Sequence, residues 1–268
     1  MLLEVLICTI DDRIAQAANV LLPQQPDVCY LVSWQLTQPT YLGQLPQALR
    51  ERTDVRVVMS EAEGGLAHNR NNALQRACGD ILLLADDDVR LETTGLACLM
   101  AYFEHHSYID VVATCAKRAD KQWHKDYPLH PIDLHEPPRG YYVSSVELAL
   151  RHTKRLPRFD ERFGLGSLHL ASGEEEVFIA DCLHAGLRAR FIPLHTVTLT
   201  NTCTTGTTFD SNAKVRRSKG AVLAYLHGAW GAILRSLKFS LFYRGTLSRW
   251  CVLKDLLWGI NYITYGRE

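Results

Sequence analysis

The sequence of 268 residues has no excess of charge of either sign, no closely paired cysteines and no long apolar run. Lysine plus arginine and aspartate plus glutamate number 29 each, so no overall positive field indicates nucleic acid as a partner. The eight cysteines are scattered without a C-x-x-C pair, which disfavours zinc-finger and redox motifs and favours a reduced, cytoplasmic compartment. No apolar run approaches the roughly 18 residues of a membrane span, so we expect a chain that does not cross a membrane.

The first ten residues, MLLEVLICTI, lack the basic start and cleavage site of a signal peptide, and we interpret them as a strand. Similar apolar runs alternate with helical patterns through the first half of the chain. The expected strands are Leu2–Thr9, Val28–Ser33, Val55–Met59, Ile81–Ala85 and Asp110–Cys115. The expected helices lie around Ile14–Leu22, Gly43–Arg50, Ala67–Cys78 and Thr93–Glu104. This alternation predicts an α/β fold with a mostly parallel sheet and helices on both faces.

The second half of the chain is less regular. Glu174–His184 is a predicted helix, with Ser172 as its N-cap and Gly186 as its stop signal. A short strand is expected at Arg190–Pro193, and a further helical pattern near Asn212–Trp230. Residues 117–140 are rich in proline, histidine and charge without periodicity, so we expect a long surface loop, and loops of that length are more often functional than idle.

Three consecutive aspartates, Asp86, Asp87 and Asp88, follow an apolar strand directly. Ligands of parallel α/β sheets bind beyond the carboxyl ends of the strands, where this triplet is expected to lie. Carboxylates that crowd together repel one another, and a hard divalent cation makes the arrangement favourable. Mg²⁺ is typically held by one or two carboxylates plus phosphate oxygens of a substrate. The alternative is a turn or helix cap, where aspartate is common.

A glycine pair, Gly64-Gly65, precedes a helix whose first turns hold His68, Asn69, Arg70, Asn71 and Asn72. The free N–H groups of a helix start, with an arginine nearby, suit a diphosphate. A polar, solvated helix start is the alternative interpretation.

The stretch SGEEEVF, from Ser172 to Phe178, places three glutamates at a helix start. Ser172 and Glu175 have the spacing of a capping box, which explains both residues structurally. A carboxylate that faces the pocket there is also suited to take a proton as general base. Each histidine of the chain is by itself expected to be a surface or hydrogen-bonded residue. His195 is of more interest, because it lies just past an expected strand in the same half as the glutamates.

Four stretches in order resemble the inverting family 2 glycosyltransferases of the GT-A fold. They are LICTIDDR, GGLAHNRNNALQRACGDILLLADDDV, RFDERFGLGS and SGEEEVFIADCLHAGLRARFIP, which together span roughly residues 2–195. The resemblance implies inverting transfer of a sugar from a nucleotide-sugar donor, expected to be a UDP-sugar, to a hydroxyl of a glycan or lipid-linked acceptor. It also implies a Mn²⁺ or Mg²⁺ cofactor and a role in bacterial surface polysaccharide synthesis, such as capsule, O-antigen or lipopolysaccharide.

The resemblance also implies roles for single residues. Asp88 would coordinate the cation, Asp86 would lie against the ribose or the metal shell, and His195 is a candidate further metal ligand. Glu175 stands where relatives carry an aspartate as general base, and both Glu175 and its neighbour Glu174 are candidates for that role. The candidate nucleotide-sugar contacts are Thr9, Ile10, Asp11, Arg13, Ser33, Gln35, His68, Arg70, Asn71, Asp86 and Asp87.

The second strand departs from the family pattern. Relatives usually end it with an aspartate that contacts the base, whereas this chain reads YLVSWQLTQ. Ser33 or Gln35 is suited to hydrogen-bond a uracil there, and Trp34 to stack on it.

Two other classes of protein fit part of the pattern. A metal-dependent phosphatase of the haloacid-dehalogenase type also ends an apolar strand in Asp-x-Asp, but it needs Thr or Val where this chain has Arg90. A non-catalytic module that binds sugar nucleotides or carbohydrate would tolerate loss of the base.

Residues 1–205 are expected to form the catalytic domain, and residues 206–268 a helical extension packed on it. From Arg235 to Ile260, basic residues alternate with aromatic ones. This composition suits an amphipathic surface on anionic lipid, at the cytoplasmic face of the plasma membrane. A dimer interface or a helix packed on the catalytic domain is equally consistent with it.

Overall fold

The computed structural model describes residues 1–60, 63–201 and 208–266. Its residue contacts divide into two units. The first unit comprises Met1–Glu63, His68–Arg158 and Asp181–Thr202, and the second comprises Gly64–Ala67, Phe159–Ala180 and Cys203–Glu268. Residues 159–180 thus group with the C-terminal helices, whereas the sequence assigns them to the catalytic domain. The expected boundary near residue 205 stays a prediction.

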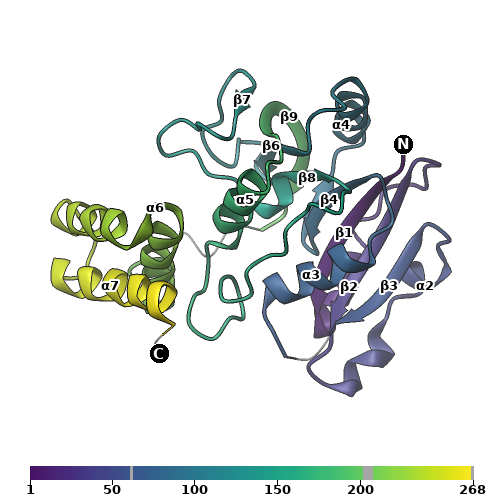
Figure 1. Cartoon of the computed structure of the whole chain (residues 1–268). Helices are drawn as coiled ribbons and strands as arrows, with labels where there is room; N and C mark the ends of the chain where they lie inside the picture. Colours follow the sequence, from purple (N-terminus) through teal and green to yellow (C-terminus); the bar gives the residue numbers. More distant parts are fainter. Residues whose placement is uncertain (61–62, 202–207, 267–268) are drawn as a thin grey trace. The chain divides into compact units, whose positions relative to one another are not determined.

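The first unit is built on a nine-stranded sheet with the order β3-β2-β1-β4-β8-β6-β9-β5, and β7 pairs with β9 off this path (Figure 1). The strands are β1 (Leu3–Ile10), β2 (Val28–Gln35), β3 (Val55–Ser60), β4 (Ile81–Asp86), β5 (Val89–Leu91), β6 (Val111–Arg118), β7 (Ile132–Asp133), β8 (Leu148–Arg151) and β9 (Ala189–Leu199). All five strands expected from the first half of the sequence are present.

The first four strands of the order, β3, β2, β1 and β4, are mutually parallel. Their apolar runs are buried, and in β1 the side chains of Leu3, Val5, Leu6 and Ile7 are fully inaccessible. A strand that is covered on both faces needs such a continuous apolar run. Because these strands run in the same direction, the residues at their carboxyl ends gather at one edge of the sheet.

The remainder of the sheet is mixed. The short strand β8 pairs antiparallel with both β4 and β6, so β4 and β6 point the same way. Strand β9 runs parallel to β6 and antiparallel to β5. It is longer than the expected Arg190–Pro193 and continues through His195 to Leu199, with register shifts opposite Cys115.

The helices of the first unit agree with the sequence where they are long. Helices α3 (Leu66–Arg76) and α4 (Thr93–His105) lie where the patterns place them. In place of the expected helix Ile14–Leu22 the structure has two short helices, η1 (Asp11–Arg13) and α1 (Ile14–Ala17). The backbone hydrogen bonds that follow them span three residues, as in turns. Likewise, the expected helix Gly43–Arg50 is divided into η2 (Pro39–Gln44) and α2 (Gln47–Glu51). Pro46 lies between these two segments. Proline lacks the N–H that a continuous helix would need there, so the helix is interrupted.

Helix α5 (Glu174–His184) has the predicted bounds, and Gly186 ends it with φ 73°. Its start differs from the prediction by one residue. The carbonyl of Gly173 accepts the first helical bond from the amide of Val177, so Gly173 occupies the cap position. The capping box predicted between Ser172 and Glu175 is therefore wrong in register, and the Ser172 amide instead donates to the Ser218 hydroxyl.

The second unit contains the helices α6 (Ala213–Leu241) and α7 (Arg249–Tyr265), which confirm the expected helical extension. Helix α6 is kinked at Gly228, whose φ of 68° is not helical. The two helices cross closely, because a Cβ on Gly220 would lie 2.0 Å from the Leu256 carbonyl oxygen and one on Gly259 would lie 1.9 Å from that of Arg217. Within the described residues, no helix is both long and apolar enough to cross a membrane.

Candidate active site

The aspartate triplet lies at the carboxyl edge of the sheet, as predicted. Asp86 is the last residue of β4, Asp87 and Asp88 form a turn, and β5 begins at Val89. The three side chains differ sharply in exposure: Asp86 is 35% exposed, Asp88 is 25% exposed and Asp87 is 3% exposed. The triplet is therefore two accessible carboxylates with a buried one between them.

Asp87 is held on all sides by polar partners. Its carboxylate accepts a hydrogen bond of 2.6 Å from the Thr9 hydroxyl and one of 2.9 Å from Arg13 Nε, and it forms an ion pair with Arg13 Nη2. The hydrogen bond to Asp87 raises the pKa of the Arg13 guanidinium above its ordinary value. These contacts explain Asp87 as an anchor that joins β1, η1 and the end of β4. A direct contact of Thr9, Arg13 or Asp87 with a nucleotide stays a prediction.

Asp88 is held more loosely. Its side chain accepts a hydrogen bond of 3.1 Å from Asn201 Nδ2 and lies 3.5 Å from Arg13 Nη2. The Asp88 carbonyl accepts hydrogen bonds from the amide and the hydroxyl of Thr200. The backbone is thus fixed, while part of the carboxylate faces solvent.

Helix α3 contributes the next group of predicted residues. Arg70 is almost fully buried and its Nη2 donates to the Ser145 hydroxyl at 2.6 Å and to Asp86 at 3.3 Å. Arg70 therefore orients the first aspartate of the triplet. Asn71 is also buried, and His68 is half-buried. At the helix start, the amide of Leu66 is already occupied, because it donates to the Leu165 carbonyl at 2.7 Å.

The carboxyl ends of β1 and β2 are tied together by Asn69. Its Nδ2 donates to the carbonyls of Thr9 and Ser33 at 3.0 and 3.1 Å, and its Oδ1 accepts from the Ser33 hydroxyl at 2.5 Å. Asn72 donates to the same hydroxyl at 2.7 Å. The sequence pattern does not single out Asn69 and Asn72 as binding residues, and the signal for them is the polar helix start itself.

The residues predicted to bind a base on β2 are inaccessible in this structure. Ser33 is fully buried and Gln35 is 4% exposed, so a contact of either with a nucleotide stays a prediction. Trp34 is 1% exposed and belongs to the hydrophobic core, and its Nε1 donates to the Asp11 carbonyl at 2.9 Å. The prediction that the Trp34 ring stacks on a base is wrong, because neither face of this core ring is accessible.

Asp11 occupies a strained position next to this edge. Its φ of 47° is in the left-handed region, which non-glycine residues rarely adopt and which is over-represented at functional sites. The carboxylate accepts hydrogen bonds of 2.8 and 2.7 Å from the amide and the hydroxyl of Thr37. Asp11 thereby holds the segment after β2, and its neighbour Ile10 is 37% exposed.

His195 lies in a different group of side chains. Its Nε2 contacts the Val197 carbonyl at 3.0 Å and the Thr198 hydroxyl at 3.2 Å, and lies 4.0 Å from Glu92. Burial lowers the pKa of the imidazole below its ordinary value. Among the described residues, no three His, Cys, Asp or Glu side chains are grouped so as to hold a metal ion, so the structure does not bring His195 together with Asp86 and Asp88. Its role as a ligand stays a prediction.

The two glutamates at the start of α5 have different surroundings in the second unit. Glu174 is 5% exposed, and its carboxylate lies against the backbone of Gly164, where an added Cβ would come within 2.9 Å of Glu174 Cδ. Gly164 has a φ of 98°, which favours glycine in any case. Glu175 is half-buried. Of the two, Glu175 is the more accessible carboxylate.

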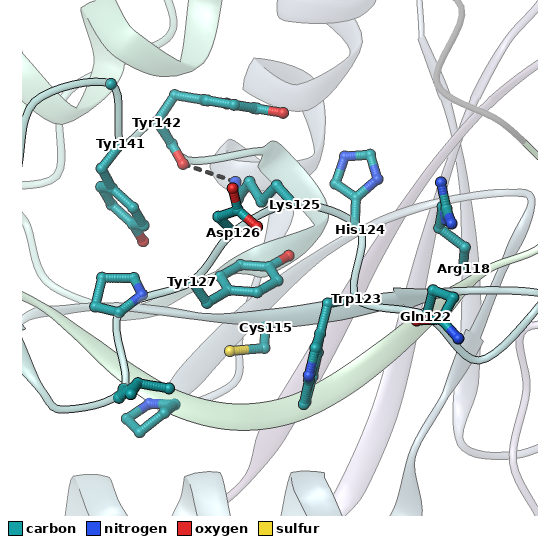
Figure 2. A pocket seen from close by; sticks show the side chains of 14 residues that line it. Cys115, Arg118, Gln122, Trp123, His124, Lys125, Asp126, Tyr127, Tyr141 and Tyr142 are labelled. Atoms are coloured by element: carbon teal, nitrogen blue, oxygen red, sulfur yellow. Dashed lines mark hydrogen bonds between the residues drawn. The ribbon is translucent and has the colours of Figure 1, made fainter.

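A cavity of about 820 Å³ opens beside the loop predicted from residues 117–140 (Figure 2). The loop lies between β6 and β8, and Trp123 forms an isolated bridge to Lys117. The cavity is lined by Cys115, Arg118, Gln122, Trp123, His124, Lys125, Asp126, Tyr127, Pro128, Leu129, Gly140, Tyr141, Tyr142 and Pro193. Sequence analysis identified the loop, but not the two tyrosines that follow it.

Comparisons with known proteins bear on this arrangement. Residues 42–166, which contain the aspartate triplet and Arg70, match the family described as Glycosyl transferase family 2. This match covers 125 of the 268 residues, and through it the chain is similar to the family 2 glycosyltransferases. The comparison with curated proteins gave no match.

Solved structures show the same fold. The structure of Staphylococcus aureus TarS 1–349 in complex with UDP-GlcNAc superposes with a TM-score of 0.63 at 17% identity, over 98% of this chain and 84% of that one. The complex of TarS 1–349 with UDP gives 0.58 at 17% identity, over 91% and 76%. A longer S. aureus TarS chain gives 0.57 at 17% identity, over 91% of this chain but only 44% of that one. The chain thus has the GT-A fold that the sequence predicted.

Proposed function

We propose that this glycosyltransferase moves a sugar from a UDP-sugar donor to an acceptor hydroxyl, with inversion at the anomeric carbon and with the help of a divalent cation. The observation that carries the proposal is the pair of accessible carboxylates, Asp86 and Asp88, at the carboxyl edge of the sheet within the family 2 segment. The TarS structures that contain UDP-GlcNAc and UDP support the choice of nucleotide.

The donor set of the triplet suits Mn²⁺ or Mg²⁺. Asp86 and Asp88 offer carboxylate oxygens, which hard divalent cations prefer, whereas the Asp87 carboxylate is occupied by Thr9 and Arg13. Two protein carboxylates leave coordination positions for phosphate oxygens of the donor. When bound, the cation supplies electrophilic help to the departing diphosphate.

The residues of the chain have separate tasks in the proposed reaction. Arg70 holds Asp86 in place, and Asp87 with Arg13 and Thr9 fixes the turn that presents Asp88. Glu175 accepts the proton of the acceptor hydroxyl as that oxygen attacks the anomeric carbon. Glu175 lies in the first turn of α5. Glu174, buried against Gly164, is assigned to hold the helix start.

Release of UDP from a panel of UDP-sugars in the presence of Mn²⁺ tests this function. We expect Glu175→Gln to lower the rate at least 100-fold, the usual range for loss of acid–base catalysis, and Asp88→Ala to lower it by a similar factor because a cation ligand is lost. Asp27→Asn is a matched control, because Asp27 is exposed and precedes β2 at the opposite edge of the sheet. Unchanged rates in both active-site variants would contradict the proposal. Donor binding by the parent protein without UDP release would favour the non-catalytic module instead.

We further propose that the second unit contacts the cytoplasmic face of a membrane that carries a lipid-linked acceptor for surface polysaccharide. C-terminal to Gly228, large apolar side chains of α6 are exposed to solvent and small side chains are buried. The exposed residues are Trp230, Leu234, Leu237 and Leu241, with exposed fractions of 81, 67, 46 and 59%. The buried residues are Ala232, Ser236 and Ser240. This is the reverse of a helix that faces water, and such a surface is typical of an interaction site.

The charge of this segment favours lipid as the contact. Between Cys203 and Glu268 there are ten lysines and arginines against three acidic residues, Asp210, Asp255 and Glu268. Asp255 is buried and is paired with Arg216 at 2.6 Å, so it does not offset the exposed cations. A second copy of this face would bring like charges together, whereas an anionic bilayer would neutralise them.

A further inference from the structure

Two partly exposed aromatic side chains line the cavity beside β6. Trp123 is 50% exposed and Tyr142 is 45% exposed, so part of each side chain is accessible to solvent. Figure 2 shows Trp123 and Tyr127 from the loop, with Tyr141 and Tyr142 from the segment that follows it. Aromatic rings of this kind can pack against the apolar C–H faces of a sugar ring while its hydroxyl groups stay hydrated or hydrogen-bonded.

One buried cation, Lys125, contacts the three tyrosine rings, and a second cation, Lys117, lies 4.9 Å from the centre of the Trp123 ring. Lys125 Nζ lies 4.1 Å from the centre of the Tyr142 ring, 5.4 Å from that of Tyr127 and 5.7 Å from that of Tyr141. It also donates to the Tyr142 carbonyl at 2.6 Å and pairs with the fully buried Glu147 at 2.6 Å. Tyr127 donates its hydroxyl to the same glutamate at 2.5 Å. The tyrosines are therefore held in place before any ligand binds, and Tyr127 packs edge-on against Trp123, which lowers the entropic cost of binding.

The charges around the cavity favour an uncharged ligand. Lys125 is neutralised by Glu147, and Arg118 is paired with Asp120 at 3.0 Å. Burial and the nearby cations lower the pKa of His124 below its ordinary value, which keeps the imidazole neutral near pH 7. Asp126 adds a negative charge to the lining. A phosphate would meet this carboxylate as well as the Lys117 ammonium over the Trp123 ring, whereas a neutral sugar would bury no charge.

The cavity lies close to the aspartate triplet along the sheet. Arg118 on β6 and Val89 on β5 both pair with Leu199 of β9, so they are neighbours of the same residue on its two sides. Adjacent strands are about 4.8 Å apart, which separates Arg118 from Val89 by about 10 Å. Val89 directly follows Asp88, and β6 points in the same direction as β4. A ligand in the cavity thus lies at the same edge as the proposed donor site.

We propose that this cavity binds a neutral sugar ring of the acceptor, with Trp123 and Tyr142 as its aromatic contacts. The inference rests on the proposed glycosyl transfer, because it gives the acceptor of that reaction a binding site in the cavity. It also defines the acceptor as a glycan that presents an uncharged pyranose, in preference to an anionic polyol phosphate.

Ligand-observed saturation-transfer NMR with a panel of p-nitrophenyl hexosides and N-acetylhexosaminides tests the inference. We expect saturation transfer to at least one glycoside in the parent protein and in Trp123→Phe, which keeps an aromatic ring. We expect the signal to fall at least fivefold in Trp123→Ala and in Tyr142→Ala. Trp250→Ala is the matched control, because Trp250 is an exposed tryptophan on α7 and its replacement is expected to leave the signal unchanged.

Thermal stabilisation by UDP with Mn²⁺ is measured on the same samples and separates two kinds of failure. If UDP stabilises the parent protein but no glycoside of the panel binds, or if both alanine variants bind as the parent does, the cavity is not the acceptor site. The same conclusion follows if glycerol phosphate competes for the cavity better than every neutral glycoside. If UDP gives no stabilisation and no UDP-sugar is consumed, the proposed function itself fails.

Discussion

At the scale of single residues, the aspartate triplet divides into a structural member and two accessible ones. Asp87→Asn removes the charge that Arg13 and the Thr9 hydroxyl contact in a buried position. We expect a loss of about 2 kcal/mol in the free energy of unfolding, the range for hydrogen bonds to charged groups. Asp88→Asn, at a partly exposed position, is expected to change stability by less than about 0.5 kcal/mol. Urea unfolding followed by circular dichroism measures both, and equal losses would contradict the division.

The buried pair of Lys125 and Glu147 gives a second prediction at this scale. Lys125→Met leaves Glu147 buried without its cation, and removing one partner of such a pair costs about 3–5 kcal/mol. The double variant Lys125→Met/Glu147→Gln is expected to regain much of this loss, because no charge is left buried. Urea unfolding at pH 7.5 measures both variants. A double variant as unstable as the single one would indicate that lost packing, not the unpaired charge, is responsible.

The same pair predicts how stability depends on pH. Burial raises the pKa of Glu147, and Lys125 opposes that effect. In Lys125→Met the Glu147 carboxyl therefore keeps its proton to higher pH in the folded protein than in the unfolded chain. Between the unfolded and the folded pKa the folded state binds more protons, so stability falls as pH rises. We expect Lys125→Met to lie closer to the parent protein in stability at pH 5 than at pH 7.5. The opposite trend would contradict this assignment.

At the scale of helices and strands, the sequence predicts the elements that have long, regular patterns. The four parallel strands and helices α3, α4 and α5 follow from apolar runs and helical spacing. Strand β8 escaped prediction because its three buried residues, Leu148–Leu150, are too short a run to distinguish from a loop. Strand β5, with three residues, is also too short to be predicted from its pattern. Its residues are strand only because β9 pairs with them, which no local pattern reveals.

The candidate site was predictable to a similar degree. The sequence placed Asp86–Asp88 and Arg70 at one edge, because strand direction alone determines that position. It did not reveal that Asp87 is the buried member, since the contact with Thr9 and Arg13 joins residues more than 70 positions apart. Trp34 was misjudged for a related reason. A tryptophan at a strand end has the same sequence signal whether its ring is exposed or packed in the core.

The exposed apolar stripe of α6 makes a prediction for this element. We expect the protein to sediment with vesicles that contain anionic phosphatidylglycerol, and less so with pure phosphatidylcholine or at 0.5 M salt. Leu234→Glu/Leu237→Glu should reduce the bound fraction at least fivefold, because charge on this stripe opposes burial in the interface. Leu129→Glu is the control, since Leu129 is exposed outside the second unit. Equal sedimentation of parent and double variant would refute the proposed membrane contact.

At the scale of the whole molecule, binding of donor nucleotide and cation is expected to appear as added stability. A ligand that binds only the folded state at 100 times its dissociation constant adds about 2.7 kcal/mol, which corresponds to a rise of several degrees in melting temperature for a protein of this size. We expect UDP with Mn²⁺ to raise the melting temperature and EDTA to remove most of the increase. Asp88→Asn should keep the melting temperature of the free protein and lose the Mn²⁺-dependent part. A rise that persists in Asp88→Asn would place the cation elsewhere, whereas a rise with UDP alone, insensitive to EDTA, would show nucleotide binding without a metal.

The division into two units predicts where the stabilisation by UDP is found, because Asp86 and Asp88 both lie in the first unit. A stabilising effect of UDP should therefore be seen in hydrogen exchange of β1 and β4 rather than of α6 and α7.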